Sequence, residues 1–306
     1  MALVTGTVRV SVPATSANLG PGFDALGLAL TMRDRLTATL LDGGLEIEVT
    51  GAGADEVPRD SSHLVVRCIN RALHELGEEP VGLPDSAHGL RLTCDNVIPH
   101  SRGLGSSSAA IVAGLALGRA LVVGGDLLMN DDALFALAAE IEGHPDNVAP
   151  AAYGGFVIAG HEGDTFYAAE SAVDPSISAV VFVPSTPVET KVARGLLPAT
   201  VPHADAAANA GRAALLVAAL AGQPSLLLWA TRDWLHQDYR EPAMPESVAL
   251  VRALRADGHA AIISGAGPTV LAFAASKGDR QALVARTPEG WVSYPLDVDH
   301  EGVVVS

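Results

Sequence analysis

The sequence predicts an α+β fold in two halves, and three observations support this fold class. Strand-like and helix-like segments alternate without the regular β-α rhythm of a doubly wound sheet. The first part of the chain is β-rich, and a glycine-led apolar segment at 103–125 then indicates a buried helix. A further β run at 180–183 opens a region of Ala-rich helices and short strands. Because 306 residues suffice for two domains that share a cleft, we place a boundary between 160 and 174, which divides the chain into 1–165 and 166–306.

The elements of the first half follow from hydrophobic periodicity and turn residues. The predicted elements are strands at 7–12, 36–41, 45–50, 90–96 and 154–159 and helices at 61–76, within 103–125 and from 130 to about 143. Asp-Gly-Gly at 42–44 is a turn signal between two strands. Ser61 or Ser62 is expected to cap the first helix, and Gly77 to end it.

The second half is predicted from the same kinds of signal. The predicted elements are helices at 204–221 and 245–256 and strands at 180–183, 260–264 and 269–273. Aromatic residues are only 4% of the chain, so Ala, Val, Leu and Ile must fill the core. Cys68 and Cys94 suit neither a disulfide scaffold nor a CxxC zinc site, and we expect two buried thiols.

The charge balance argues against two classes of partner. Nineteen basic residues face thirty-five acidic ones, and the formal net charge is -16. Binding to nucleic acid usually needs the opposite balance, and so does binding to an anionic membrane surface. The segment MALVTGTVRV lacks the basic and apolar regions of a signal peptide, and the apolar segment 109–125 is interrupted by Arg119 and glycines. We therefore expect a cytoplasmic protein with no nucleic-acid and no membrane partner.

Lysine is scarce, and its positions exclude several enzyme classes. Lys191 and Lys277 are the two lysines of the chain. Neither stands in a GxxxxGK[ST] loop or a VAIK-like strand, which excludes P-loop nucleoside triphosphatases and protein kinases. No GxSxG elbow and no HExxH motif occurs. Any phosphate chemistry must therefore use backbone amides, hydroxyls, arginine and metal.

The segment PHSRGLGSSSAA at 99–110 combines three properties of an anion site. Gly103 and Gly105 let backbone amides approach a ligand closely. The serines at 106–108 offer hydroxyls at the start of a predicted helix, whose free N–H groups attract a nucleotide phosphate. The alternative is a plain capped helix after a tight turn.

Two further segments of the first half gather polar groups. In NLGPGFD, Asn18 and Asp24 bring an amide and a carboxylate to a strand end, although such residues also bond their own backbone in turns. The second segment, 140–150, contains Glu140, Glu142, His144, Asp146 and Asn147. A carboxylate at a helix end that faces phosphates suits Mg²⁺, and the alternative is a solvated polar helix end.

The second half has one glycine turn and two arginines of interest. SGAGPT at 264–269 follows a predicted strand, and Val270 stands where the last glycine of GxGxxG would be. A dinucleotide site is therefore poorly supported, and a binding loop and a hairpin turn remain equal alternatives. Arg194 and Arg240 have polar neighbours, and guanidiniums suit a substrate carboxylate; the alternative for each is a surface arginine.

Taken in order, these motifs resemble the GHMP superfamily of small-molecule kinases and, within it, the homoserine kinases. GLGSSSA resembles the ATP phosphate loop of the superfamily, and SGAGPT its C-terminal motif. PATSANLGPGFDALGLAL and HPDNVAP indicate the homoserine branch, and with TKVAR and LHQDYR the resemblance covers most of the chain. It implies an N-terminal domain like ribosomal protein S5 domain 2, a ferredoxin-like C-terminal domain, and ATP and substrate in the cleft between them.

The resemblance also implies a reaction and the residues that serve it. ATP and L-homoserine give ADP and O-phospho-L-homoserine, in threonine biosynthesis, with Mg²⁺. The residues implied for ATP are Pro99, Arg102, Gly103, Leu104, Gly105, Ser106, Ser107 and Ser108. Those implied for L-homoserine are Asn18, Asp24, His144, Asp146, Asn147, Arg194, Arg240, Gly265 and Gly267, with the two arginines on its carboxylate and an acid such as Asp24 on its ammonium. Ser106 or Ser107 with Glu142 would hold the metal, and Asp146, Glu142 and Ser106 are the implied catalytic residues.

Two questions about the chemistry stay open in the sequence. Only Gly143 separates Glu142 from His144, where other members carry a longer insertion, so Glu140 rivals Glu142 for the metal. Mevalonate-type relatives place a lysine in the first motif, and this chain has none there. Asp146 is the candidate base, although phosphoryl transfer can run mainly on positioning and charge neutralisation.

Two other functions remain as alternatives to a homoserine kinase. They are a GHMP kinase for another small alcohol, which NLGPGFD disfavours, and a catalytically silent metabolite-binding regulator, which the retained Glu142 disfavours. Ser62, His63 and Arg67 are the candidates for contact with adenine. The resemblance suggests a homodimer, which no sequence pattern here establishes.

Overall fold

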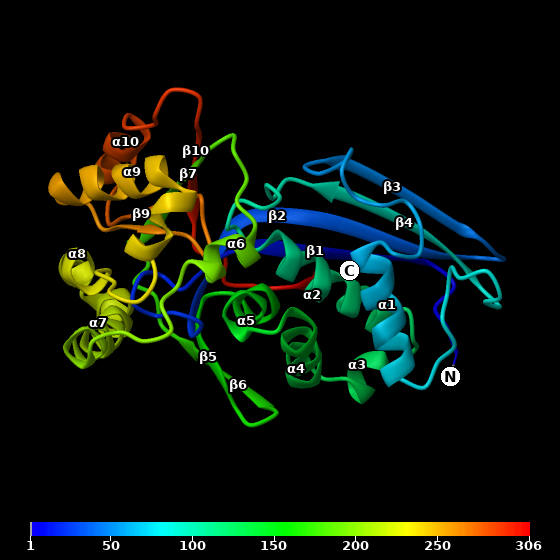
Figure 1. Ribbon diagram of the computed structural model, residues 1–306. Coiled ribbons are helices and arrows are strands. Elements are labelled where there is room, and N and C mark those ends of the chain that lie inside the picture. Colours follow the sequence, from blue (N-terminus) through cyan, green and yellow to red (C-terminus); the bar gives the residue numbers. More distant parts are fainter. Residues whose placement is uncertain (1) are drawn as a thin grey trace.

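The computed structural model describes residues 2–306 and shows two lobes, each built on its own sheet (Figure 1). The strands are β1 (Thr7–Ala17), β2 (Leu26–Leu41), β3 (Leu45–Gly51), β4 (Gly89–Asn96), β5 (Phe156–Glu162), β6 (Thr165–Ser171), β7 (Ser178–Val183), β8 (Ala261–Ile263), β9 (Val270–Ala274), β10 (Val292–Asp297) and β11 (Val304–Val305). The helices are α1 (Leu64–Glu75), α2 (Ser106–Ala120), α3 (Gly125–Leu128), α4 (Asp131–Glu142), α5 (Pro145–Tyr153), α6 (Thr190–Gly195), α7 (His203–Gly222), α8 (Leu227–Ala230), α9 (Pro245–Ala256) and α10 (Lys277–Val284), with short 3₁₀ turns η1 (Pro224–Leu226) and η2 (Asp238–Ala243). The α+β class is confirmed.

The first sheet has seven strands in the order β11-β1-β2-β4-β3, with β5 and β6 joined to the start of β2. Helices α1, α2, α4 and α5 cover one face of it (Figure 1). Helix α2 is buried nearly all round, as its apolar sequence predicts, because it lies between α1 and the strands. This burial fixes the start of α2, where the GLGSSS segment lies, against the sheet.

The turn at 42–44 lies between two strands, as predicted, but the strands on either side of it do not pair with each other. β3 pairs with β4 in parallel, and β4 separates β3 from β2. The turn signal is local, whereas pairing depends on which strand offers a buried face. In β4 this face is Leu90, Leu92 and Cys94, which are almost wholly buried.

The start of the first helix also differs from its prediction. Helix α1 begins at Leu64, and the ring nitrogen Nδ1 of His63 accepts the N–H of Val65. Ser62 is instead engaged in a turn in which its N–H and hydroxyl both donate to Asp60. The serine signal therefore marks the turn that precedes the helix. The caps at Asn130 and Gly143 on α4 are as predicted.

The second sheet is antiparallel, with the order β10-β7-β9-β8. Numbered along this lobe, the order is 4-1-3-2, which is the ferredoxin-like arrangement. β7 is buried on both faces: Val181 and Val183 pack into the core that includes the first lobe, and Val180 and Phe182 pack with α9. The two lobes therefore share a continuous core beneath the cleft.

Chain segments from both sides of position 165 contribute to the first sheet. β6 runs from Thr165 to Ser171 in that sheet, and β11 returns to pair with β1. The division into 1–165 and 166–306 remains a prediction about the units of the chain. Cys68 and Cys94 are buried free thiols, as predicted, and burial raises the pKa of each to about 12.

Helix α7 is the one helix in the described part of the chain that is long and apolar enough to cross a membrane. One such helix is weak evidence for a span. Its buried Asn209 donates a hydrogen bond to the carbonyl of Pro21 in the first lobe, at 2.7 Å. The cytoplasmic location remains a prediction.

Candidate active site

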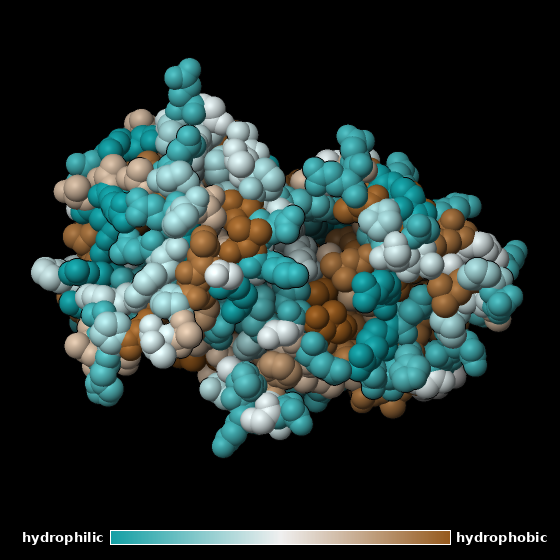
Figure 2. Space-filling model, viewed as in Figure 1, coloured by the Kyte–Doolittle hydropathy of each residue, from teal (hydrophilic) through white to brown (hydrophobic). Residues whose placement is uncertain are grey.

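A cavity of about 150 Å³ lies between the lobes, where the molecule is hollowed in Figure 2. Its walls include Asn18, Arg102, Gly103, Gly105, Ser106, Ser107, Ser108, Glu142, His144, Asp146, Asn147, Arg194, Arg240 and Gly265, all of them predicted site residues. The predicted residues that do not line it are Pro99, Leu104, Asp24 and Gly267. The structure thus brings together six stretches of sequence that lie far apart in the chain.

The GLGSSS segment is a rigid loop at the start of α2. Gly103 and Gly105 have φ of 74° and 70°, a left-handed conformation that favours glycine. A Cβ at Gly105 would overlap the hydroxyl of Thr15 on β1, and a Cβ at Gly103 would overlap the carbonyl of Ser264. Ser264 also donates its hydroxyl to the carbonyl of Gly103, at 2.6 Å. The loop is therefore held between β1 and the SGAGPT turn. The first residues of α2, whose N–H groups have no partner within the helix, line the cavity.

Glu142 faces this loop, and Glu140 does not. Ser107 and Ser108 donate their hydroxyls to the two carboxylate oxygens of Glu142, at 3.0 and 2.8 Å. Glu140 instead pairs with Arg71 on the outer surface. Two positions apart on one helix, these residues project in different directions, so of the two only Glu142 meets the GLGSSS loop. The sequence did not reveal that Ser108, which is fully buried, anchors this carboxylate.

Helix α5 begins beside Glu142 and brings three more polar groups to the cavity. Nδ1 of His144 lies 2.9 Å from Oδ1 of Asp146, whose carboxylate is 2% exposed. Burial favours the neutral ring, but the hydrogen bond and charge of Asp146 and the charge of Glu142 outweigh it and raise the pKa of His144. Asn147 accepts the hydroxyl of Thr15 at 2.8 Å, which orients its amide.

The NLGPGFD loop connects β1 to β2 in a strained conformation. Asn18, Leu19 and Asp24 all have left-handed φ angles, between 48° and 66°. The side chain of Asn18 spans the loop: its oxygen accepts the N–H of Asp24, and its nitrogen donates to the carbonyl of Gly265, both at 2.9 Å. Asn18 thus ties the loop that carries Asp24 to the SGAGPT turn of the other lobe.

Arg194 on α6 meets Asp24 across the cleft. Its Nη1 and Nη2 lie 3.0 and 2.6 Å from the two carboxylate oxygens of Asp24, in a bidentate pair. This hydrogen bonding raises the pKa of Arg194. The pair is 36% exposed on each side, so it is open to exchange with other ions.

Arg240 is a buried cation that lacks a full set of partners. It is 1% exposed, and Nη1 donates to Nδ1 of His236 and to the carbonyl of Gly265, both at 3.0 Å. Its Nε has no hydrogen-bond partner. Burial, with the charge of Arg194, lowers the pKa of Arg240 to about 10. Because an unpaired buried cation is costly, this guanidinium is suited to an anion that enters the cavity.

A second cavity of about 290 Å³ adjoins the first through Ser101, Ser106 and Ser107. Its other walls include Asp34, Val57, Pro58, Ser62, His63, Cys94, His100 and Ala110. Ser62 and His63, two of the three adenine candidates, line it, and the exposed Arg67 does not. Arg102 is taken up elsewhere: Nε donates to the carbonyl of Pro184 at 3.0 Å, and Nη2 to that of Ser185.

Asp34 in this second cavity is a buried acid, and the sequence did not single it out. It is a lone carboxylate on the core face of β2, and its Oδ1 accepts the N–H groups of Val97 and Ile98 at 2.6 and 2.9 Å. Burial raises its pKa to about 6, in spite of these hydrogen bonds. The acidic residue at an inward position of an alternating strand was the signal that could have found it.

Asp34→Asn is expected to make the stability less dependent on pH. The folded pKa of about 6 exceeds the ordinary value of 3.8, so the folded state binds more protons between these values and stability falls as pH rises through them. At about pH 8 the asparagine variant should therefore be more stable, by about 3 kcal/mol at most, and below about pH 4 the difference should vanish. Urea unfolding across this range measures it. Asp42→Asn, in an exposed turn, is the control; parallel pH profiles for wild type and Asp34→Asn would contradict the prediction.

Known proteins share both the sequence and the fold. Family models named GHMP kinases N terminal domain and GHMP kinases C terminal match residues 63–155 and 212–292. Homoserine kinase of Streptomyces avermitilis is 55% identical over 299 residues, which are 97% of this chain and 95% of that protein. Homoserine kinase of Clavibacter michiganensis subsp. michiganensis is 48% identical over 99% of this chain and 96% of its own length.

Solved structures agree with these matches. The crystal structure of homoserine kinase from Cytophaga hutchinsonii superposes with a TM-score of 0.85 at 28% identity, and covers 100% of this chain and 99% of that one. Mevalonate kinase of L. major has a TM-score of 0.68 at 18% identity over 97% of this chain and 96% of its own, a likeness of fold alone. Sequence, fold and the order of the motifs point the same way: the chain is an ATP-dependent kinase that belongs to the homoserine kinases of the GHMP kinase family.

Proposed function

We propose that the two joined cavities bind ATP and L-homoserine side by side and that the residues described above carry the transfer. The γ-phosphoryl group of ATP passes to the side-chain hydroxyl of L-homoserine and gives O-phospho-L-homoserine. The observation that carries this proposal is the meeting, in one small cavity, of a helix N-terminus with free N–H groups, a carboxylate held by serines, and two arginines. These are the groups that a triphosphate, its metal and an amino acid require.

The nucleotide is proposed to span both cavities. The GLGSSS loop and the first turn of α2 supply the amides for its phosphates, because a helix N-terminus with positive-φ glycines is a ready anion site. The second cavity, lined by Val57, Pro58 and Ala110, suits the base, and Ser106 and Ser107 lie where the two cavities meet. Pro99 and Arg102 then support the loop and do not touch phosphate.

The residues present fit Mg²⁺ as a partner of the nucleotide. Glu142 and the hydroxyls of Ser106 and Ser107 are oxygen donors, which Mg²⁺ prefers. Within residues 2–306 no group of three or more His, Cys, Asp or Glu forms a cage for a metal. One carboxylate with phosphates and waters is the usual arrangement for a kinase metal. When bound there, Mg²⁺ neutralises charge on the phosphates.

The amino acid is proposed to bind where Asp24 and Arg194 meet. A zwitterion that enters between them replaces one ion pair by two, with its carboxylate on Arg194 and Arg240 and its ammonium on Asp24. Asn18 and Asn147 present amides to the same cavity, and His144 and Asp146 lie at its wall. Gly265 supplies a carbonyl that already orients Asn18 and Arg240.

The chemical step needs little from the protein beyond this placement. The hydroxyl oxygen of L-homoserine forms a bond to the γ-phosphorus while the bond from that phosphorus to the bridging oxygen of ADP breaks. The hydroxyl proton passes to Asp146 or to water. Because phosphoryl transfer has a loose transition state, positioning and neutralisation of charge dominate, and the proton moves late.

The proposal is tested by the release of ADP from Mg-ATP with five acceptor conditions: L-homoserine, L-threonine, L-serine, mevalonate and no acceptor. Stimulation by L-homoserine alone is the expected result. Stimulation by another alcohol would agree with the proposed nucleotide site but would contradict the proposal that the Asp24 loop selects L-homoserine. Binding of ATP with no turnover in any condition would favour a regulator without catalytic activity.

Asp146→Asn is expected to lower kcat by about tenfold and leave activity well above background, because a loose transition state gains little from a strong base. The substitution is isosteric, and the amide oxygen still meets Nδ1 of His144. The measurement is kcat with saturating Mg-ATP and L-homoserine. A loss as deep as that of Glu142→Ala would instead assign proton transfer to Asp146.

Asp24→Asn is expected to weaken selection for the substrate ammonium. The ratio of kcat/KM for L-homoserine to that for 4-hydroxybutyrate, which lacks the amino group, should fall by about tenfold or more, since a charge-assisted hydrogen bond is lost. Asp238→Asn is the matched control, because Asp238 is an exposed carboxylate paired with Arg252 at the surface. An unchanged ratio would contradict the role of Asp24.

A further inference from the structure

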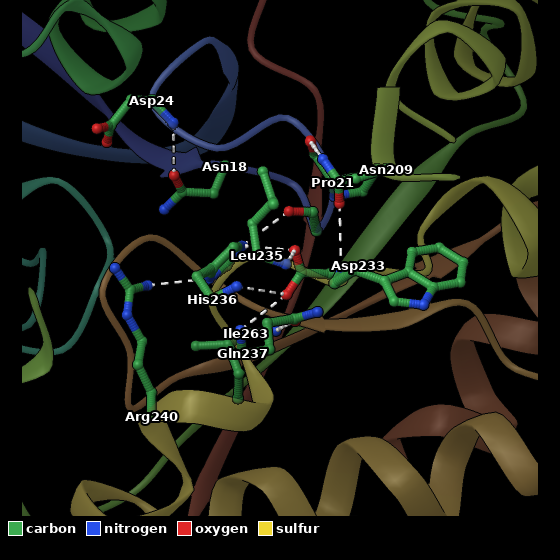
Figure 3. Close-up of polar contacts among 12 residues, drawn as sticks. Asn18, Pro21, Asp24, Asn209, Asp233, Leu235, His236, Gln237, Arg240 and Ile263 are labelled. Carbon is green, nitrogen blue, oxygen red and sulfur yellow. Dashed lines mark hydrogen bonds and ion pairs between the residues drawn. The ribbon is translucent and has the colours of Figure 1, made fainter. Parts of the chain in front are cut away.

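His236 is a fully buried imidazole that lies between the NLGPGFD loop and Arg240 (Figure 3). It does not line either of the two cavities. Its Nε2 lies 2.7 Å from the carbonyl oxygen of Gly20, and its Nδ1 lies 3.0 Å from Nη1 of Arg240. Nδ1 therefore contacts Arg240 of the proposed substrate site, and Nε2 contacts the loop that bears Asn18 and Asp24.

The two contacts determine one tautomer. A carbonyl oxygen only accepts, so Nε2 must carry the proton and donate it to Gly20. A guanidinium only donates, so Nδ1 must offer a lone pair to Arg240. Burial lowers the pKa of His236, which keeps the ring neutral and its lone pair free. In a protonated ring, the N–H of Nδ1 would point at the N–H of Nη1 of Arg240, and two donors would face each other.

The turn that carries His236 is itself fixed. The carboxylate of Asp233, whose side chain is 1% exposed, accepts the N–H groups of Leu235, His236 and Gln237 at 2.7 to 3.1 Å. Figure 3 shows these bonds converging on Asp233, with Arg240 reaching His236 from the far side. The side-chain oxygen of Gln237 accepts the N–H of Ile263 at 2.6 Å, which ties the same turn to β8.

The opposite side of His236 is equally constrained. Asn209 donates to the carbonyl of Pro21 at 2.7 Å and accepts the N–H of Trp234 at 3.2 Å. The loop that bears Asp24 and the turn that bears His236 are thus joined at two adjacent points, through Asn209 and through His236 itself. Little freedom remains in the separation between this loop and Arg240.

We propose that His236 is a positioning residue. Its Nδ1 holds the guanidinium of Arg240 in place to bind the carboxylate of the substrate. Its Nε2 fixes the position of that guanidinium relative to the loop that bears Asp24. The inference rests on the proposed function, in which Arg240 and Asp24 bind the two charged groups of L-homoserine. Without the acceptor at Nδ1, the carbonyl of Gly265 alone would hold Nη1 of Arg240. The affinity for the amino acid should then fall, and the affinity for ATP should not.

Two amide substitutions of His236, to asparagine and to glutamine, distinguish a role in positioning Arg240 from a role in packing. His236→Asn places an amide oxygen near the position of Nδ1 and loses the donor to Gly20. His236→Gln reaches Gly20 and loses the acceptor for Arg240. A packing role predicts that the larger glutamine is tolerated better, whereas a positioning role predicts the reverse. Both variants retain hydrogen-bonding groups for the buried site, which favours folding.

The experiment measures KM for L-homoserine, KM for ATP and kcat for wild type and both variants. His236→Gln should raise the KM for L-homoserine by about tenfold or more, and His236→Asn should keep it within about threefold of wild type, since a hydrogen bond to a charged group is lost in the first only. The KM for ATP should stay within about twofold in both. Equal KM values for L-homoserine, or the reverse order, would overturn the inference.

A second measurement tests that His236 acts through Arg240. In an Arg240→Ala background, His236→Gln should change the KM for L-homoserine by less than about twofold, because the partner of Nδ1 is already absent. An undiminished effect would mean that His236 acts by another route. Wild type in the same assays separates the two proposals: no turnover of L-homoserine by wild type defeats the proposed function, and turnover with the wrong order of variants defeats only the role of His236.

Discussion

Glu142→Ala is expected to lower kcat by about a thousandfold, with the KM for L-homoserine little changed. Glu142 is the carboxylate that Ser107 and Ser108 hold against the GLGSSS loop. Its removal takes away the proposed charged oxygen ligand for Mg²⁺ and leaves a buried serine hydroxyl without its acceptor. The loss of a metal that neutralises phosphate charge costs several kcal/mol of transition-state stabilisation, and about 4 kcal/mol corresponds to a thousandfold.

The matched control for this prediction is Glu140→Ala. Glu140 lies on the same helix two positions earlier, and it pairs with Arg71 at the outer surface. An exposed pair of this kind contributes little, so activity should stay within about twofold of wild type. The measurement is kcat as a function of Mg²⁺ concentration for both variants. Should the two variants be swapped in their effects, the metal would belong to Glu140.

Arg240→Ala is expected to raise the KM for L-homoserine by about a hundredfold or more, since truncation of one partner of a buried charge pair costs several kcal/mol. The guanidinium is 1% exposed, and its Nε has no partner in the protein. Burial has already lowered its pKa to about 10, so the protein maintains this charge at a cost in stability. The alanine variant is relieved of this cost but leaves a cavity and two acceptors, Nδ1 of His236 and the carbonyl of Gly265, without their donor, so its thermal midpoint is measured beside the KM to check that it folds.

Two comparisons make this test specific. Selection for L-homoserine over 3-aminopropan-1-ol, which lacks the carboxylate, should collapse in Arg240→Ala and persist in wild type. Arg232→Ala is the control, because Arg232 is an exposed arginine whose guanidinium carbon lies 4.6 Å from the ring centroid of Trp234, in the same region. A preserved preference for the carboxylate in Arg240→Ala would place that group elsewhere, with Arg194 as the remaining candidate.

Local patterns in the chain predicted much of the fold. Helix α9 has the bounds expected from its periodicity, and α4 has the caps expected from Asn130 and Gly143. These features depend on residues within a turn or two of each other, so a short stretch of sequence contains the cause. The turn at 42–44 was predicted as a turn between two strands, but this signal does not show which strand pairs with β3, because β4 lies about forty positions away.

The residues of the candidate site likewise fall into those that local sequence predicts and those that depend on distant contacts. Glycines and serines at 103–108 predict an anion-binding loop by their own chemistry, since backbone freedom and a helix N-terminus are local properties. The choice between Glu140 and Glu142 was not local. It depended on which face of α4 meets α2, and the serine hydroxyls decide it in favour of Glu142 as the carboxylate at the loop.

Composition and periodicity were enough to predict an α+β chain with an anion loop and a carboxylate-rich helix end, because each of these features has its physical cause within a few residues. The kinase activity came from the resemblance of the ordered motifs to a known family. Only the tertiary structure decided which distant groups meet. It paired Asp24 with Arg194, and it placed His236 between Gly20 and Arg240. Such contacts arise from the packing of two lobes on a shared core, and no local pattern of residues encodes a distance across a cleft.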